Sequence, residues 1–115
     1  MQRLDCLKQI LEILDAKGIR YKYHSWVNIP TDHCFATWFV PSEKFDGADL
    51  QNFYEDYTLQ IALFYKKSKD TADFENERAF EDELRGAGAF SKLCSFDNSN
   101  ELFTSVYTFE FRQFI

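Results

Sequence analysis

The most regular alternation of side chains lies in the last third of the chain. Two aromatic-rich runs there have a period of two: Phe90, Lys92, Cys94 and Phe96, then Phe103, Ser105, Tyr107, Phe109 and Phe111. A period of two residues lines one face of a β-strand. The polar residues Asp97–Asn100 separate the runs, so the pattern predicts two strands that meet at a turn.

Two other segments follow a helical period. Leucines recur at three- and four-residue intervals from Leu4 to Leu14, and Lys17-Gly18 then ends the predicted helix because glycine adopts the left-handed exit. A second, acidic helix is predicted over 71–84, with Asp70 or Thr71 as its cap and Arg85–Gly88 as its end. Four of its side chains are expected to face a sheet: Phe74, Ala79, Phe80 and Leu84.

Three more strands are expected between the helices. The segments 19–24 and 57–65 alternate, whereas 34–40 is apolar at nearly every position and predicts a strand inside the sheet, ended by Pro41. The polar segment from Pro41 to Tyr57 predicts a long loop. The order helix, three strands, helix, two strands predicts one α+β domain over 1–115: a largely antiparallel sheet of about five strands with two helices packed on it.

The amino-acid composition limits the kinds of protein that this chain can be. A chain of 115 residues fits one domain, and an aromatic content of 18% supplies a core. The net charge of −6 argues against a protein that binds nucleic acid through phosphate contacts. Three cysteines without a C-x-x-C motif predict buried thiols in a reducing compartment. The sequence shows neither a signal-peptide pattern nor an apolar run long enough for a membrane span, so a cytosolic protein is expected.

Three features suggest chemistry, and each has a simpler explanation. The five carboxylates of the second helix, Glu75, Glu77, Glu81, Asp82 and Glu83, fit a solvated outer face better than an acid–base pair.

The other two features are a histidine-rich loop and a glycine pair. His24, His33 and Cys34 beside Asp32 lack a further ligand at a usable spacing for a metal or Cys-His site. Gly86 and Gly88 end a helix instead of forming a phosphate loop. We therefore predict no catalytic residue, no cofactor and no metal site, and a protein that is not an enzyme.

The order of elements resembles that of the small tail-completion, tail-terminator or head–tail joining proteins of bacteriophages and prophages. The resemblance covers nearly the whole chain: the helix Leu4–Lys17, the central strand Tyr57–Lys67, the acidic helix within Ser68–Leu84 and the last strand Leu102–Phe111. It implies a structural protein of virion assembly that forms a homo-oligomeric, hexameric ring on the tail tube.

The implied partners are further copies of the chain, the major tail-tube protein and the head or neck connector, with DNA only in passage and no membrane. The implied location is the virion tail or neck, and the host bacterial cytoplasm during assembly. The predicted loop 41–57 is the candidate contact surface because it mixes aromatic and acidic residues. Its candidate contacts are Glu43, Phe45, Asp46, Asp49, Phe53, Tyr54, Glu55 and Asp56.

Other interpretations stay open. A solvated loop whose aromatic residues cover the sheet edge explains the same segment equally well. The chain could be a small acidic phage-encoded inhibitor that mimics nucleic acid, or a domain that binds a ligand between the first helix and the sheet. For a ring, Phe103–Phe111 or Ile19–His24 is the expected edge strand at the interface.

Overall fold

The computed structural model describes residues 3–26, 28, 30–46, 54–66 and 68–114, and places side chains at 6–26, 28, 30–41, 56–66 and 68–111. The elements follow the predicted order: α1 (Arg3–Ala16), β1 (Arg20–Tyr23), β2 (Cys34–Asp46), β3 (Tyr54–Lys66), α2 (Thr71–Leu84), β4 (Phe90–Asp97) and β5 (Leu102–Phe114). The α+β class with two helices and a five-stranded sheet is confirmed, and the sheet is mixed.

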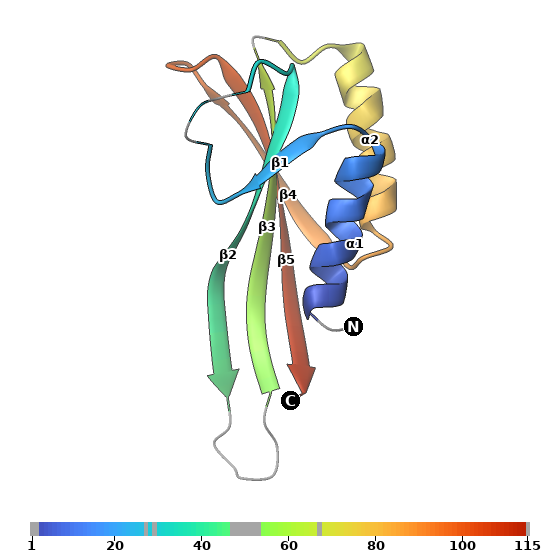
Figure 1. Ribbon diagram of the computed structural model, residues 1–115, viewed down its shortest axis with the longest axis vertical. Coiled ribbons are helices and arrows are strands. Elements are labelled where there is room, and N and C mark those ends of the chain that lie inside the picture. The colour runs from blue at the N-terminus through green and yellow to red at the C-terminus, as the bar shows by residue number, and fades with distance from the viewer. Residues whose placement is uncertain (1–2, 27, 29, 47–53, 67, 115) are drawn as a thin grey trace.

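The strands lie in the order β1-β2-β3-β5-β4 (Figure 1). β1 pairs with β2 in parallel, and the other three pairs are antiparallel. The edges are therefore β1 and β4. The expectation of an edge at Ile19–His24 is confirmed, whereas that for Phe103–Phe111 is wrong because β4 folds back along β5 and covers it.

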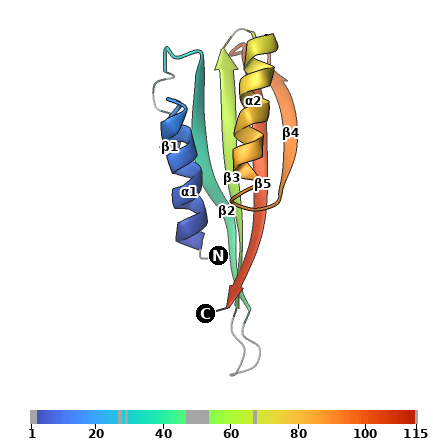
Figure 2. The same ribbon diagram turned by 90° about the vertical axis from the view of Figure 1, so that its right-hand side faces the viewer.

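Both helices pack on the same face of the sheet (Figure 2). The buried positions of β3 recur at every second residue from Tyr57 to Tyr65, and Tyr107 and Phe109 of β5 lie beside them. Cys6, Ile10 and Leu14 of α1 are fully buried against this layer. The predicted periods of two and of three to four residues thus meet in one core.

α2 uses a narrower face than the sequence predicts. Its buried residues are Asp73, Glu77, Phe80 and Leu84. Phe80 packs edge-on against Tyr107 at 5.6 Å between ring centroids. Phe74 and Ala79 are exposed, so their predicted contact with the sheet is wrong. The spacing of the buried set, four, three and four residues, is that of one helical stripe.

β2 does not end at Pro41. The strand continues to Asp46 through a register shift between Phe39 and Ser42, and β3 begins at Tyr54. Most of the predicted loop 41–57 is therefore a β-hairpin, and the prediction was wrong because a proline at a bulge need not end a strand. The interior position predicted for 34–40 is confirmed, since Phe35, Ala36 and Thr37 are all buried.

The predicted element ends are confirmed at three places. Gly18 follows α1 with φ +69°. The backbone N–H groups of Ala87 and Gly88 donate to the Leu84 carbonyl after α2. The Asp97 carboxylate accepts from the backbone N–H of Ser99 and from the Asn100 side chain between β4 and β5.

The cysteines differ in exposure. Cys6 is buried, Cys34 is half-buried and Cys94 is exposed on β4, so the prediction of buried thiols holds for Cys6 alone. No helix among the described residues has the length and apolar character that a membrane crossing requires.

Candidate functional site

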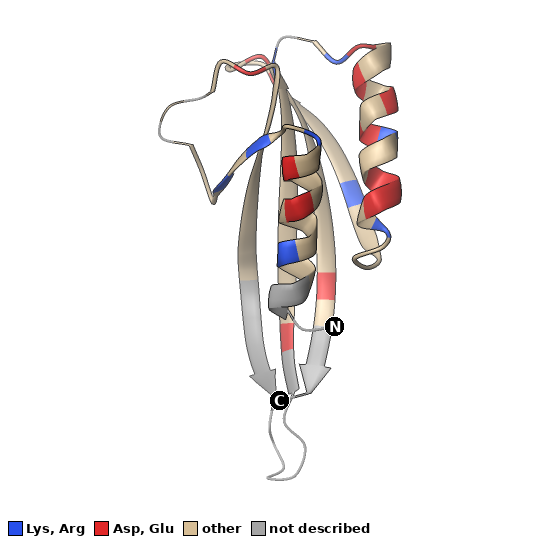
Figure 3. Cartoon of the chain, turned by 45° about the vertical axis from the view of Figure 1, so that its right-hand side comes forward, with Lys and Arg blue, Asp and Glu red and all other residues tan. Residues whose placement is uncertain are grey.

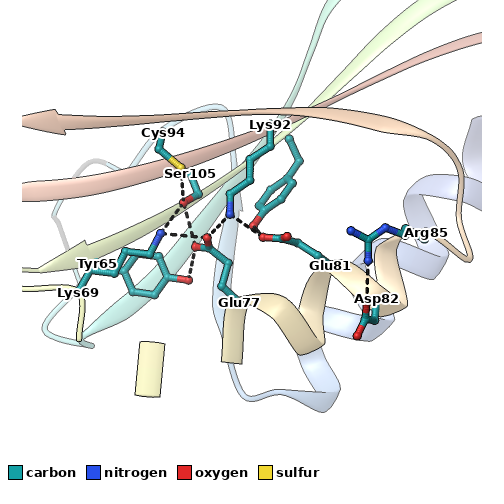
Figure 4. Close-up of polar contacts among 10 residues, drawn as sticks. Tyr65, Lys69, Glu77, Glu81, Asp82, Arg85, Lys92, Cys94 and Ser105 are labelled. Carbon is teal, nitrogen blue, oxygen red and sulfur yellow. Dashed lines mark hydrogen bonds and ion pairs between the residues drawn. The ribbon is translucent and has the colours of Figure 1, made fainter. Parts of the chain in front are cut away.

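A buried carboxylate joins α2 to the sheet. Glu77 is 2% exposed. Its Oε2 accepts hydrogen bonds from Tyr65 Oη at 2.8 Å and Ser105 Oγ at 2.9 Å. Its Oε1 accepts from Lys69 Nζ at 2.9 Å and from Lys92 Nζ (Figure 4). The expectation that Glu77 lies on a solvated face is therefore wrong.

Lys92 extends this network to a second carboxylate. Its Nζ donates to Glu81 Oε2 at 2.6 Å, and Tyr107 Oη donates to the same oxygen at 2.7 Å. Two lysines thus balance two glutamates. A buried charge is tolerated when it is paired and hydrogen-bonded, as here. We name Tyr65, Lys69, Glu77, Glu81, Lys92, Ser105 and Tyr107 the Glu77 network.

The pKa values of Glu77 and Lys92 both shift in the direction that favours the ion pair. Burial by itself would raise the pKa of Glu77, but hydrogen bonds from Lys92 and Lys69 outweigh it and lower that pKa. Burial would likewise lower the pKa of Lys92, and its bonds to the two glutamates raise it instead. Both groups are therefore held in their charged forms. The network fixes α2 to β3, β4 and β5.

Acidification is predicted to destabilise the fold through this network. Because the pKa of folded Glu77 is lowered, its stabilisation is present above the pKa of an unfolded glutamate and is lost as the pH falls through the folded value. We expect the free energy of unfolding to drop as the pH falls below about 5, through the ordinary range of a glutamate and below it. Urea unfolding at several pH values measures this. The drop should be smaller in Glu77→Gln, and parallel curves for the two proteins would contradict the assignment.

The amino-terminal end of α2 holds a second polar cluster. Asp70 caps the helix: its Oδ1 accepts from the Asp73 backbone N–H at 3.0 Å, and Asp73 Oδ2 accepts from the Asp70 backbone N–H at 3.0 Å. Asp73 Oδ2 also lies 2.8 Å from His33 Nε2. Burial would raise the pKa of Asp73, but the hydrogen bond from His33 and those from Asp70 lower it.

The cap predicts a moderate stability effect. Asp70→Ala removes one half of this reciprocal pair, so we expect a loss of about 1 kcal/mol in the free energy of unfolding. Chemical denaturation followed by circular dichroism measures it. Asp70→Asn, which keeps an acceptor oxygen, should lose much less. Equal losses in the two variants would show that the charge, and not the cap, accounts for the effect.

The structure does not bring His24 and His33 together. His24 packs edge-on against Phe39 at 4.8 Å, whereas His33 pairs with Asp73. Among the residues that the structure describes, no group of three or more His, Cys, Asp or Glu side chains is arranged to hold a metal ion. Burial, with the nearby carboxylates Asp73 and Glu77, raises the pKa of Cys34 to about 12, which keeps this thiol protonated.

A pocket of about 380 Å³ lies beside the Glu77 network, between the end of α1, α2 and the sheet. Its wall combines apolar side chains with polar ones: Lys17, Ile19, His33, Cys34, Leu63, Tyr65, Asp73, Asn76, Glu77 and Phe80, together with Gly18. The carboxylates on this wall already hold partners within the protein, namely His33 for Asp73 and the two lysines for Glu77.

The structure divides the described contact residues between two paired strands. Glu43, Phe45 and Asp46 lie in β2, and Tyr54, Glu55 and Asp56 lie in β3. The backbone register places Phe45 opposite Glu55 and Asp46 opposite Tyr54. Asp49 and Phe53 lie outside the described residues. The contact role of all eight residues stays a prediction, and the six described ones lie in strands and not in a loop.

Sequence reasoning missed the Glu77 network, although a signal was present. Glu77 stands three residues before Phe80 and seven before Leu84, which places it on the apolar stripe of α2. A carboxylate on such a stripe requires a cation beside it, and Lys92 supplies one from a β4 position that the alternating pattern also turns toward the helices.

A comparison of the chain with known protein families gives no match, and a comparison with curated proteins gives none either.

Proposed function

We propose that this protein is a structural subunit of a bacteriophage tail, which assembles into a ring that caps the tail tube and joins it to the head or neck. The layout of elements on which the sequence resemblance rests supports the proposal. The observation that carries it is an arm of sheet along which neither outer strand continues. We use the name arm for the stretches Ser42–Asp46 of β2, Tyr54–Thr58 of β3 and Glu110–Phe114 of β5, which pair with one another.

The arm extends beyond both helices (Figures 1 and 2). β1 pairs with β2 at Phe35–Trp38, and β4 pairs with β5 at Leu102–Phe109, so among the described residues neither outer strand continues along the arm. A stretch of sheet with open backbone edges is a site for pairing with another chain. A subunit of an assembly can bind its partners through such an edge.

The partners follow from this arrangement. The arm, with the candidate contacts in β2 and β3, would bind the tail tube or the neck connector, and about six copies would close the ring. The net charge of −6 suits a ring through which DNA passes, because a basic lumen would retain the phosphates. The protein would then reside in the virion tail or neck, and in the host cytoplasm before assembly.

Charge reversal in the arm is predicted to impair binding without unfolding. In Asp46→Lys with Glu55→Lys, we expect loss of co-sedimentation with purified tail tubes of the same phage and a melting temperature within a few degrees of the unchanged protein. The matched control is Glu12→Lys with Glu75→Lys, which makes the same change in net charge on exposed helix positions and should leave tube binding intact. Equal binding by both variants would reject the arm as the contact surface.

The pocket supports a second candidate function, the binding of a small molecule. Ile19, Leu63 and Phe80 offer apolar contact beside the hydroxyl of Tyr65. A small-molecule screen by thermal shift tests it, and a true ligand should lose its effect in Leu63→Trp. The nucleic-acid mimic is less favoured, because Glu77 and Glu81 bind lysines beneath α2 and leave fewer carboxylates for its outer face (Figure 3).

A further inference from the structure

The edge strand β4 is unusually open. Its residues from Ser91 to Asp97 are all exposed, and Phe90 is half-buried. Leu93 is 71% exposed and Phe96 45% exposed. Because antiparallel strands direct alternate N–H and C=O groups to opposite sides, half of the backbone polar groups of β4 point away from β5. The strand thus offers both hydrogen-bonding groups and apolar side chains.

Proteins usually protect such an edge with a proline, a bulge, a short strand or a projecting lysine. β4 spans eight residues without a proline, and its described pairing with β5 proceeds without a register shift. Its one lysine, Lys92, is tied down by Glu77 and Glu81 and does not guard the edge.

The other edges differ from β4. β1 has four residues, and Trp26 of the following loop lies against it, with Arg20 and Lys22 at 5.6 and 5.9 Å from the indole ring. The outer edge of β2 contains Pro41 and the register shift between Phe39 and Ser42. These features discourage regular pairing at β1 and β2, and the outer edge of β5 is free only beyond Phe109, so β4 is the longest regular free edge of the described sheet.

We propose that β4 pairs antiparallel with β4 of a second copy of the chain, around a two-fold axis at Leu93, and that the free protein is a dimer. Across this axis Leu93 faces its own counterpart. On the helix side of the sheet, Phe90 faces Phe96 and Lys92 faces Cys94 of the other copy. On the opposite side, Ser91 faces Ser95.

The sequence of β4 is complementary to itself in this register. Phe90 meets Phe96, Leu93 meets Leu93 and serine meets serine, and each Lys92 lies opposite Cys94, so like charges are not directly opposite each other across the strands. Shifting the axis to Cys94 keeps the faces matched but sets Leu93 opposite Ser95 and Lys92 opposite Phe96. Leu93, which is 71% exposed, would then lack an apolar partner. The pairing is isologous and closes with two copies.

This dimer does not depend on the proposed tail function. The arm that would contact the tube belongs to the opposite end of β5 from the β4 hairpin turn, so dimerisation and tube binding can be tested by different variants. A dimer would also cover the edge while the free protein awaits its partner.

The first test is the mass in solution by size exclusion with light scattering. We expect a dimer for the unchanged protein, and at least about tenfold weaker association for Leu93→Arg, which places two cations on the axis and removes the apolar contact. Phe74→Arg, a change at an exposed aromatic residue of α2, should remain a dimer. A protein that is still monomeric at a concentration of about 100 μM would overturn the proposal, because its dissociation constant would then lie above that concentration. A Leu93→Arg protein that dimerises as well as the unchanged protein would overturn it too.

Cysteine cross-linking tests the register and serves if Leu93→Arg fails to fold. In a Cys94→Ser background, Leu93→Cys should form a disulfide-linked dimer on mild oxidation, because residues on the axis face each other within disulfide reach. Ser91→Cys should not cross-link, whereas Ser91→Cys with Ser95→Cys should. Cross-linking of Ser91→Cys alone, or none by Leu93→Cys, would overturn the stated register. A larger heterologous complex on β4 would assign the edge to another partner.

Discussion

Replacing Glu77 with alanine is expected to destabilise the fold by about 3–5 kcal/mol, the cost of leaving one partner of a buried ion pair alone. The lysine left behind is Lys69, whose side chain is only 7% exposed. Tyr65 and Ser105 would lose their acceptor at the same time. The free energy of unfolding in urea measures the effect.

Two further variants separate this cause from a general effect on the helix. Glu75→Ala changes an exposed carboxylate of the same helix and should cost less than about 0.5 kcal/mol. Glu77→Gln with Lys69→Met removes the charge pair as a unit, and Lys92 keeps Glu81, so stability should recover in large part. If Glu77→Ala costs no more than Glu75→Ala, the Glu77 network does not hold α2 in place.

Phe80→Ala is the second large effect that we expect. Phe80 is 1% exposed and packs against Tyr107, so truncation leaves a cavity in the centre of the core. Such a change costs about 3–5 kcal/mol. The matched control is Phe74→Ala in the same helix. Phe74 is 57% exposed and its ring lies 4.5 Å from Lys69 Nζ, so its removal should cost no more than about 1 kcal/mol. Equal losses would contradict the placement of the buried stripe.

The elements themselves were predictable because their signals are local. The leucine spacing of α1, the alternation of β3 and β5, and the turn at Asp97 each depend on residues close in sequence. The predicted break at Pro41 failed because the bulge that accommodates a proline depends on its pairing with β3. The parallel pairing of β1 was equally invisible, since a four-residue alternating segment pairs either way.

The polar site was harder to predict than the fold. The partners of Glu77 come from β3, the segment before α2, β4 and β5, and they converge through the topology of the sheet. The helical spacing of Glu77 with Phe80 and Leu84 indicated burial, but the abundance of carboxylates in α2 suggested a solvated face. The pocket beside it likewise forms between residues from Lys17 to Phe80, which no local pattern connects.

We propose that this chain is a ring-forming subunit of a phage tail. The most direct test mixes the purified protein with tail tubes of the same phage and examines the tube ends by electron microscopy, with the mass of the bound material measured in parallel. We expect a ring of about six copies at one end of each tube, and tubes that stop lengthening once the ring is bound. Tubes that continue to grow with bare ends in excess protein would contradict it.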